Sequence, residues 1–272
     1  MIRLVASDLD GTLLRSDGQV SERTRAAITA AIAGGLQVAF VTGRPPRWLT
    51  EIADATGHSG VAVSANGAVL YDLASEEVLR SHLLQPTDLA TVTGQLIEAF
   101  PDVKFAVEYG LAFGHEPGYR HHWEISPAYD RQGNVIAAPL VAPLSEVIAR
   151  PGVKLLAKDR DADPDDFLAA AAVLLDGQVT VTRSSQVALL EITVHGVTKA
   201  SGLAELAGTL GVAPHEVAAV GDMPNDLPML EWAGTSYAVA NAHRDVLDIA
   251  DHVLASNDED AVAQLLESLT PR

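Results

Sequence analysis

Residues 3–13 read RLVASDLDGTL and join a short apolar run to a polar turn. The run from Arg3 to Ser7 has the composition of a buried parallel strand, which carries apolar side chains on both faces. Ligands of open α/β sheets bind beyond the carboxyl ends of the strands. Because Asp8 and Asp10 follow this strand directly, we expect them at the ligand-binding edge of such a sheet.

The two aspartates lie close enough in sequence to repel one another, and a bound cation or a proton relieves that repulsion. Gly11 lets the chain turn sharply, so that both carboxylates face one pocket. A divalent ion suits one carboxylate, and a proton-transfer role suits the other. An ordinary strand-to-turn junction is the alternative explanation for an Asp-Gly pair taken alone.

The segments that follow alternate between helix and strand patterns. An apolar stripe at helical spacing follows Ser21, a candidate N-cap, and Gly34 ends it. Residues 36–41 have the pattern of a second strand, a helix is expected near Pro45, and residues 61–63 have the pattern of a third strand. Strands that alternate with helices predict α/β architecture with a doubly wound parallel sheet.

The C-terminal part repeats this alternation. It predicts a helix over 199–210, a strand over 217–220, short strands over 238–240 and 252–254, and a closing helix over 261–269. The middle of the chain is richer in aromatic and turn residues. It predicts helices over 86–100 and 164–175 and strands over 103–107, 153–157 and 178–181. We therefore expect a core domain made of residues 1–83 and 189–272, with residues 84–188 inserted as a second α/β domain.

Further motifs lie at predicted strand ends or helix starts. Thr42 and Gly43 follow the second strand, and a hydroxyl beside a glycine amide at a helix start is a common anion site. Lys199 lies in the first turn of a helix and opposes its dipole, so this position calls for an anionic partner. Asp222 could complete an oxygen-rich Mg²⁺ site with Asp8 and a backbone carbonyl. Each motif alone is compatible with ordinary turn chemistry or a solvated lysine, but their joint occurrence favours a site.

The ordered set of motifs resembles the haloacid dehalogenase (HAD) superfamily and, more narrowly, its Cof-type phosphatases of subfamily IIB. The motifs that carry the resemblance are Asp8-x-Asp10-x-Thr12, Thr42-Gly43-Arg44, Lys199 and Gly221-Asp222-x-x-Asn225-Asp226. Residues 64–68, 190–192 and 239–242 support it, and it is weak within 84–188. The stretch from Thr42 to Lys199 is too long for a loop inside a compact domain, and an inserted cap of the C2 type explains it.

The resemblance implies an enzyme that hydrolyses phosphomonoesters through an aspartyl-phosphate. It makes Asp8 the nucleophile and Asp10 the general acid and base. It implies a Mg²⁺ cofactor held by Asp8, the Asp10 carbonyl and Asp222. The phosphate-binding groups that it implies are the Leu9 and Gly43 amides, Thr42, Lys199 and Asn225, with Asp226 supporting Mg²⁺ and Lys199.

The implied partner is a small phosphorylated metabolite, with sugar phosphates first, and the inserted cap would set specificity. Two alternatives stay open. One is a phosphotransferase or phosphomutase that keeps the phosphoenzyme, and the other is a non-catalytic metabolite-binding protein. The second aspartate argues against binding alone, because binding does not need it. The oligomeric state is open.

The composition of the chain further limits the kinds of partner and chemistry that we expect. The chain has 272 residues, a formal net charge of −18 and no cysteine. An acidic surface repels phosphate backbones and anionic lipid, so we expect neither a nucleic-acid nor a membrane partner. The absence of cysteine excludes disulfides and thiolate chemistry. Without a signal-peptide pattern or an apolar run of bilayer length, the expected location is the cytoplasm.

Two sequence patterns in the inserted domain are typical of binding sites but also have simpler structural explanations. Asp159, Asp161 and Asp163 have the spacing of a calcium loop, but Pro164 stands where that loop needs glycine. We expect Asp163 to cap a helix that begins at Pro164 instead. The stretch from Glu116 to Trp123 gathers amphipathic side chains that could contact a sugar or another polar leaving group, or that only fill the domain: Tyr119, Arg120, His121, His122 and Trp123.

Overall fold

The structure is a computed structural model that describes residues 1–119, 127–129 and 133–270. The chain divides into two compact units. Unit 1 comprises Met1–Arg44, Trp48–Arg80 and Thr198–Arg272, and unit 2 comprises Pro45–Arg47 and Ser81–Val197. In the described part of the chain, no helix combines the length and the apolar composition needed to cross a bilayer.

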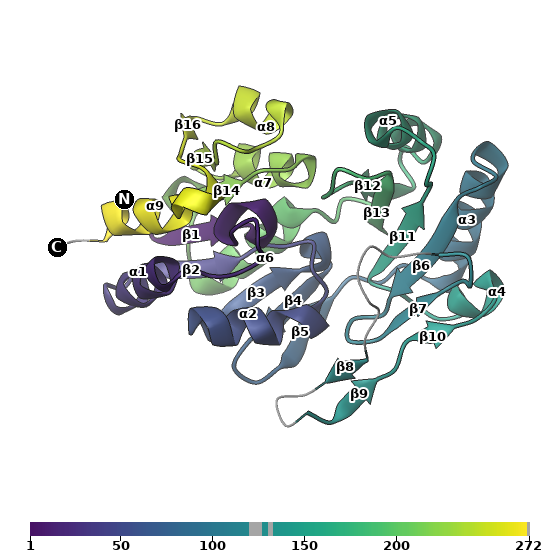
Figure 1. Ribbon diagram of the computed structural model, residues 1–272, viewed down its shortest axis with the longest axis horizontal. Coiled ribbons are helices and arrows are strands. Elements are labelled where there is room, and N and C mark those ends of the chain that lie inside the picture. The colour runs from purple at the N-terminus through teal and green to yellow at the C-terminus, as the bar shows by residue number, and fades with distance from the viewer. Residues whose placement is uncertain (120–126, 130–132, 271–272) are drawn as a thin grey trace. The chain divides into compact units, whose positions relative to one another are not determined.

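The centre of unit 1 is a five-stranded parallel sheet with the strand order β16-β15-β14-β1-β2 (Figure 1). Its strands are β1 (Leu4–Ser7), β2 (Gln37–Phe40), β14 (Val217–Gly221), β15 (Thr235–Ala238) and β16 (His252–Val253). The chain passes from β1 to β2 on one side and returns to β14 on the other side, which makes β1 the switch point where ligands bind in such sheets. The predicted α/β fold class with a doubly wound parallel sheet is confirmed.

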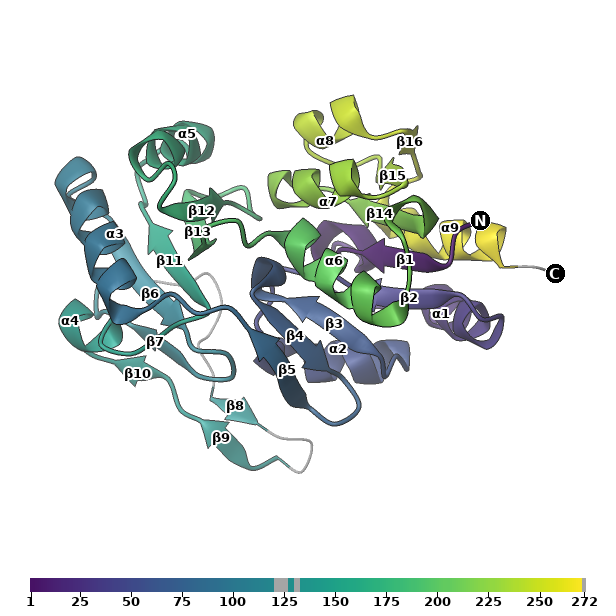
Figure 2. The ribbon, with the colours of Figure 1, turned by 180° about the vertical axis from the view of Figure 1, so that it is seen from behind.

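Helices cover both faces of this sheet. One face carries α1 (Glu22–Ala33) and α9 (Ala261–Leu269), which pack against each other (Figure 1). The other face carries α6 (Lys199–Leu210), α7 (Leu227–Trp232) and α8 (Arg244–Ile249), and Figure 2 shows α6 from that side. The apolar core beneath α6 contains Leu4 and Ala6 of β1, because alternate residues of a strand point to the same face.

A smaller three-stranded sheet follows α2 (Leu49–Thr56) and has the order β3-β4-β5. Its strands are β3 (Val61–Ser64), β4 (Val69–Asp72) and β5 (Glu77–Ser81). A single bridge between Val41 and Val63 joins the end of β2 to β3. The turn between β3 and β4 therefore lies near the end of β2.

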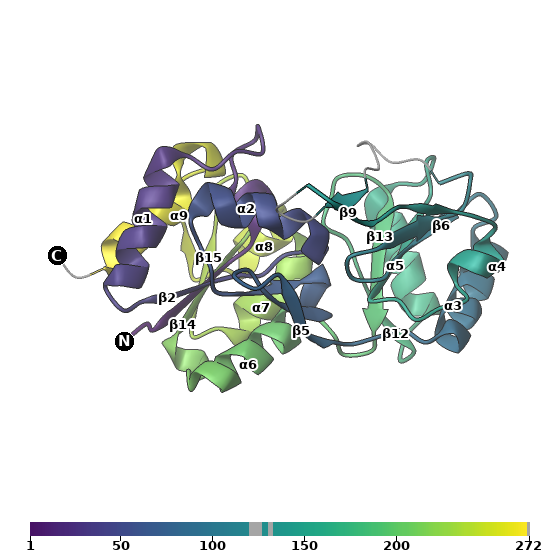
Figure 3. The same cartoon turned by 90° about the horizontal axis from the view of Figure 1, so that it is seen from below.

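Unit 2 is built on a six-stranded sheet with the order β10-β7-β6-β11-β13-β12. Its strands are β6 (Lys104–Glu108), β7 (Phe113–His115), β10 (Leu140–Val141), β11 (Lys154–Lys158), β12 (Val179–Thr182) and β13 (Leu189–Val194). A separate pair is formed by β8 (Ala128–Tyr129) and β9 (Val135–Ala137). Helices α3 (Pro86–Ala99) and α5 (Pro164–Leu174) pack on one face of the larger sheet, and α4 (Leu144–Val147) is one turn long (Figure 3).

The described structure differs from the sequence predictions in several places and adds strands that were not predicted, among them β4, β5 and β7 to β10. The sequence places residues 189–197 in the core domain, whereas β13 lies between β11 and β12 and so belongs to unit 2. The strand predicted over 238–240 lies at Thr235–Ala238. The helix predicted near Pro45 starts as a 3₁₀ turn at Pro46–Trp48 and continues as α2 from Leu49. Asp163 does cap α5, because its carboxylate accepts hydrogen bonds from the amides of residues 165 and 166.

Candidate active site

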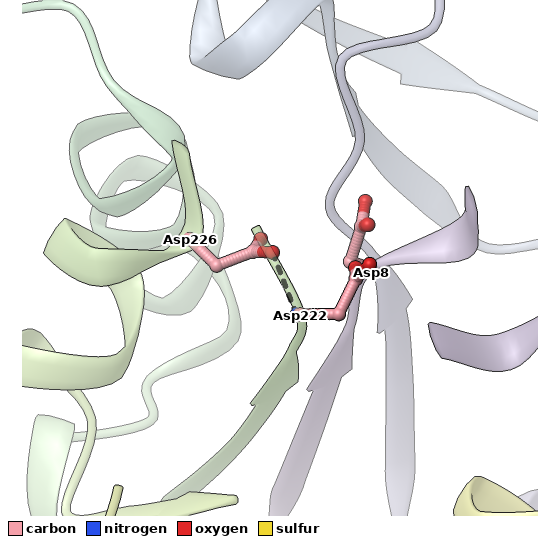
Figure 4. A group of neighbouring side chains, drawn as sticks. All are labelled: Asp8, Asp222 and Asp226. Carbon is pink, nitrogen blue, oxygen red and sulfur yellow. Dashed lines mark hydrogen bonds between the residues drawn. The ribbon is translucent and has the colours of Figure 1, made fainter. Parts of the chain in front are cut away.

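Three buried aspartates gather at the carboxyl edge of the unit 1 sheet (Figure 4). Asp8 follows β1, Asp222 follows β14, and Asp226 lies in the short turn before α7. One ligand oxygen from each lies within 4.8 Å of the others. The register explains the meeting, because Ser7 and Val220 are paired and the two strands end side by side.

Lys199 bridges two of these carboxylates. Its Nζ donates to Asp8 Oδ1 at 2.8 Å and to Asp226 Oδ1 at 2.6 Å, and the side chain is 1% exposed. A lysine in the first turn of a helix is unfavourable without an anionic partner, and these two aspartates are the partners of Lys199. A buried lysine without such partners would carry a large desolvation cost.

The start of α6 is fixed from two directions. Thr198 is its N-cap, with Oγ1 accepting from the Ser201 amide at 3.2 Å. Gly67, in the turn after β3, has a φ of 97° and lies so close to Thr198 that a Cβ there would be 1.9 Å from the Thr198 carbonyl oxygen. This close approach holds Lys199 at the sheet edge.

The Asp222 and Asp226 carboxylates are held by the surrounding loops. Asp226 Oδ2 accepts from the amides of Asp222 and Met223, both at 3.0 Å, as Figure 4 shows for the first. Asp222 Oδ1 accepts from the Thr12 hydroxyl at 2.9 Å. Thr12 belongs to the Asp8-x-Asp10-x-Thr12 motif, but the sequence alone assigns it no role; its position two residues after Asp10 is the signal that points to it.

Burial and crowded charge shift the pKa values of this group. Burial raises the pKa of Asp8 well above its usual range, against the attraction of Lys199. Burial, with repulsion from Asp226, raises the pKa of Asp222 to about 7. Burial alone would lower the pKa of Lys199, but attraction to Asp226 and Asp8 outweighs it, and the pKa is raised.

The residues present fit a divalent cation. With all three carboxylates ionised beside one ammonium, the buried group would carry two net negative charges, and a bound cation relieves that repulsion. Carboxylate oxygens are ligands that hard divalent cations such as Mg²⁺ and Ca²⁺ prefer. Both oxygens of Asp226 are already engaged by Lys199 and backbone amides, which leaves Asp8 and Asp222 as the side chains with most capacity for an ion.

The Asp10 carboxylate does not join this buried group. It is 56% exposed and makes a bidentate ion pair with Arg44, with Nε to Oδ2 at 2.7 Å and Nη2 to Oδ1 at 2.6 Å. Arg44 has no individual role among the sequence predictions. The signal that pointed to it was its position directly after Thr42 and Gly43.

The other predicted phosphate-binding residues lie in the same unit. Thr42 is buried after β2, and its Oγ1 accepts from the Arg44 amide at 3.1 Å. Gly43 follows it, and Leu9 is buried between Asp8 and Asp10. Asn225 is buried in the turn before α7, and its Nδ2 donates to Oδ1 of Asn66 at 3.0 Å. In the sequence, Asn66 stands out only as part of the supporting motif at residues 64–68.

Of the five amphipathic side chains that the sequence singles out in the stretch from Glu116 to Trp123, Tyr119 is the one that lies within the described residues. It is buried in unit 2, and its ring centroid lies 6.5 Å from that of Phe113. Arg120, His121, His122 and Trp123 lie outside the described residues. Their contact with a substrate stays a prediction.

A doubly wound sheet with a buried carboxylate and lysine group at its switch point defines a class of α/β enzyme whose site suits an anionic substrate and a cation. The family model for haloacid dehalogenase-like hydrolases matches residues 5–266, and the chain belongs to this family. It is 31% identical over 271 residues to the 5-amino-6-(5-phospho-D-ribitylamino)uracil phosphatase YitU of Bacillus subtilis. The aligned residues cover 97% of this chain and 96% of the relative.

Solved structures agree on the fold. The structure of SMU.1108c from Streptococcus mutans UA159 has a TM-score of 0.84 at 22% identity and covers 98% of each chain. The structure of the HAD subclass IIB sugar phosphatase BT4131 has a TM-score of 0.78 at 20% identity, again over 98% of each chain. The predicted family is confirmed, and the chain is a HAD-family hydrolase with full-length similarity to phosphatases.

Proposed function

We propose that this hydrolase is a Mg²⁺-dependent phosphomonoesterase that forms an aspartyl-phosphate on Asp8. The observation that carries the proposal is the Lys199 bridge, which holds Asp8 at the end of β1 beside Asp222. A carboxylate fixed in this way is a recognised type of nucleophile for phosphoryl transfer. Loose phosphoryl transition states depend mainly on positioning and charge neutralisation, and this site offers both.

In the first step, an Asp8 oxygen forms a bond to phosphorus while the phosphorus–oxygen bond of the ester breaks. The leaving oxygen takes a proton from the Asp10 carboxyl group. In the second step, the Asp10 carboxylate takes a proton from a water molecule whose oxygen bonds to phosphorus. The bond between phosphorus and Asp8 then breaks, which releases inorganic phosphate and restores both aspartates.

The remaining residues bind and orient the phosphoryl group in this proposal. Lys199 has three donors and spends two on Asp8 and Asp226, so one is left for a phosphoryl oxygen. The Thr42 hydroxyl, Asn225 and the Leu9 and Gly43 amides contact the other oxygens. Mg²⁺ would be held by Asp8, the Asp10 carbonyl and Asp222, where it supplies charge neutralisation between nucleophile and phosphate, and Asp226 supports this arrangement.

The substrate class that we propose is a small metabolite with a phosphate on a hydroxylated carbon chain. The names of two related proteins support it, since one acts on a phosphoribityl compound and the other is a sugar phosphatase. Unit 2 would act as the cap that sets specificity. Its sheet carries Lys154, Glu108 and Glu191 on the face opposite α3 and α5, and Lys154 Nζ donates to Glu191 Oε2 at 2.6 Å. All three side chains are buried, and Glu108 is paired with Arg47, so they form a buried charged group on that face of the sheet.

The test is a hydrolysis assay with p-nitrophenyl phosphate and a panel of sugar phosphates, with Mg²⁺ and with chelator. We expect turnover that needs the metal and that falls by at least about 10³-fold in Asp8→Asn. Asp54→Asn, on α2, removes an aspartate outside the carboxylate group and is the matched control. Faster loss of the phosphoenzyme on adding a second hydroxyl compound would favour a phosphotransferase, and ligand binding without turnover would favour a binding protein.

A further inference from the structure

The Asp10 carboxylate is unusual among the acidic groups of the site because it is exposed and still held in one orientation. Both of its oxygens accept from one guanidinium, at 2.7 and 2.6 Å. Within residues 1–119, 127–129 and 133–270, Arg44 is the side chain that hydrogen-bonds to this carboxylate. The backbone turns at Asp10 and Gly11 and leaves the helical region, so no regular element fixes this side chain.

Arg44 itself is anchored by its main chain. Its amide donates to Thr42 Oγ1 at 3.1 Å, and its carbonyl accepts from Ser64 Oγ at 2.6 Å and from the Ala65 amide at 3.0 Å. These bonds connect Arg44 to the ends of both β2 and β3. The Arg44 main chain is therefore fixed by hydrogen bonds, whereas no regular element fixes Asp10. The guanidinium reaches from this fixed segment to the Asp10 carboxylate.

We propose that Arg44 is a positioning residue that aims the Asp10 carboxylate at the leaving-group oxygen. The inference rests on the proposed phosphatase function. A carboxylate offers about four lone-pair directions, and a bidentate arginine occupies two of them, so two remain for the substrate and the attacking water. The guanidinium is planar and rigid, so it fixes the plane of the carboxylate, which a lysine cannot do.

The inference has a chemical signature that a merely structural role would not produce. An ester with a strongly basic leaving group, such as a sugar alkoxide, needs a proton from Asp10, whereas p-nitrophenolate leaves without one. The value of kcat/KM reports the steps up to formation of the phosphoenzyme, in which the ester bond breaks. Loss of Arg44 should therefore lower kcat/KM on a sugar phosphate far more than on p-nitrophenyl phosphate.

The experiment measures kcat/KM on both esters for the full chain with Mg²⁺ and compares Arg44→Gln, Arg44→Lys and Asp10→Asn. We expect Arg44→Gln to lose about 100-fold more on the best sugar phosphate than on p-nitrophenyl phosphate. Arg44→Lys should recover part of that difference. Asp10→Asn should show the same pattern, and adding Arg44→Gln to it should cost little more, because both changes remove one function.

The matched control is Arg23→Gln. It removes a bidentate pair of the same kind between Arg23 and Glu267, which joins α1 to α9 and contacts none of the site residues. Its losses should be small and equal on the two esters. Equal losses on both esters in Arg44→Gln would overturn the inference and indicate direct phosphate binding, and unchanged rates would overturn it as well.

Failure of the proposed function gives a different result. A folded wild-type protein that hydrolyses neither ester refutes the phosphatase and the inference together. A wild-type protein that hydrolyses p-nitrophenyl phosphate and no sugar phosphate keeps the phosphatase. It overturns the inference alone, because no basic leaving group would then depend on Asp10.

Discussion

At the scale of single residues, the site depends on a glycine that lets two loops meet. Gly11 has a φ of 76°, and a Cβ built there would lie 2.3 Å from Oδ2 of Asp222. The same short loop carries Thr12, whose hydroxyl holds the other Asp222 oxygen. Glycine at this position therefore does two things, since it permits the left-handed turn and leaves space for the carboxylate.

We expect Gly11→Ala to lower kcat/KM by at least about 100-fold, because the added methyl group displaces the Asp222 carboxylate. Gly18→Ala is the control, since Gly18 has a φ of 78° but no atom within 4 Å of the added Cβ. Each variant should lose about 1–2 kcal/mol of unfolding free energy from the left-handed backbone. Steady-state kinetics and denaturant unfolding check this, and equal activities in the two variants would contradict it.

The sequence could predict which residue types gather at this edge but not how their side chains pair. Asp8 and Asp222 were predictable because each follows a buried strand, and parallel strands end at one edge. The ion pair between Arg44 and Asp10 was not predictable, since long side chains have many rotamers and several possible partners. The contact between Asn66 and Asn225 depends on a turn with positive φ at Asn66, which local sequence shows poorly.

At the scale of elements, the start of α6 connects stability to catalysis. Thr198 and Ser201 form reciprocal side-chain to backbone hydrogen bonds that fix the first turn. Lys199 is the next residue after this N-cap, and its Nζ reaches two aspartates. A shift of the first turn would therefore move the lysine relative to Asp8.

We expect Thr198→Ala to cost about 1 kcal/mol of unfolding free energy, as the loss of an N-cap usually does. Ser21→Ala is the control, because Ser21 caps α1 in the same way through the Thr24 amide. The two variants should be destabilised alike, whereas Thr198→Ala alone should lower kcat, by about 10-fold. A pair of variants with equal stability loss and equal kcat would show that the cap does not position Lys199.

Elements with strong local signals were predicted well, and elements that depend on distant pairing were not. The end of α6 follows from apolar spacing and a closing glycine, and the N-cap of α1 from the serine before its apolar stripe. The bounds of α9 follow from apolar spacing alone. By contrast, β13 is placed in unit 2 by hydrogen bonds to β11 and β12, which no local pattern encodes. The short strands β7 to β10 have too few residues to show alternation.

At the scale of the whole molecule, the buried groups Asp222 and His58 change the free energy of unfolding in opposite directions as the pH falls. The folded-state pKa of Asp222 is raised to about 7, so its ionisation destabilises the folded protein as the pH rises from about 4 to 7. Burial lowers the folded-state pKa of His58 to about 4, against a smaller backbone effect from Val38. His58 therefore affects the free energy of unfolding with the opposite sign. The stability that its neutral ring contributes above pH 6.5 is lost as the pH falls toward 4.

The His58 contribution can be isolated by substitution. His58 is buried, with its ring edge-on to Phe40 at a centroid distance of 4.7 Å, so His58→Phe keeps an aromatic ring and removes the titration. Between pH 7 and pH 4, the wild type should lose about 3 kcal/mol more unfolding free energy than this variant, from the 2.5-unit difference in pKa. The Asp222 contribution is common to both proteins and cancels in the comparison.

Denaturant unfolding across this pH range measures the difference, with His195→Phe at an exposed position as the control. Parallel stability curves for the wild type and His58→Phe would mean that His58 accepts a proton without unfolding cost, and the acid sensitivity would then have to come from other groups.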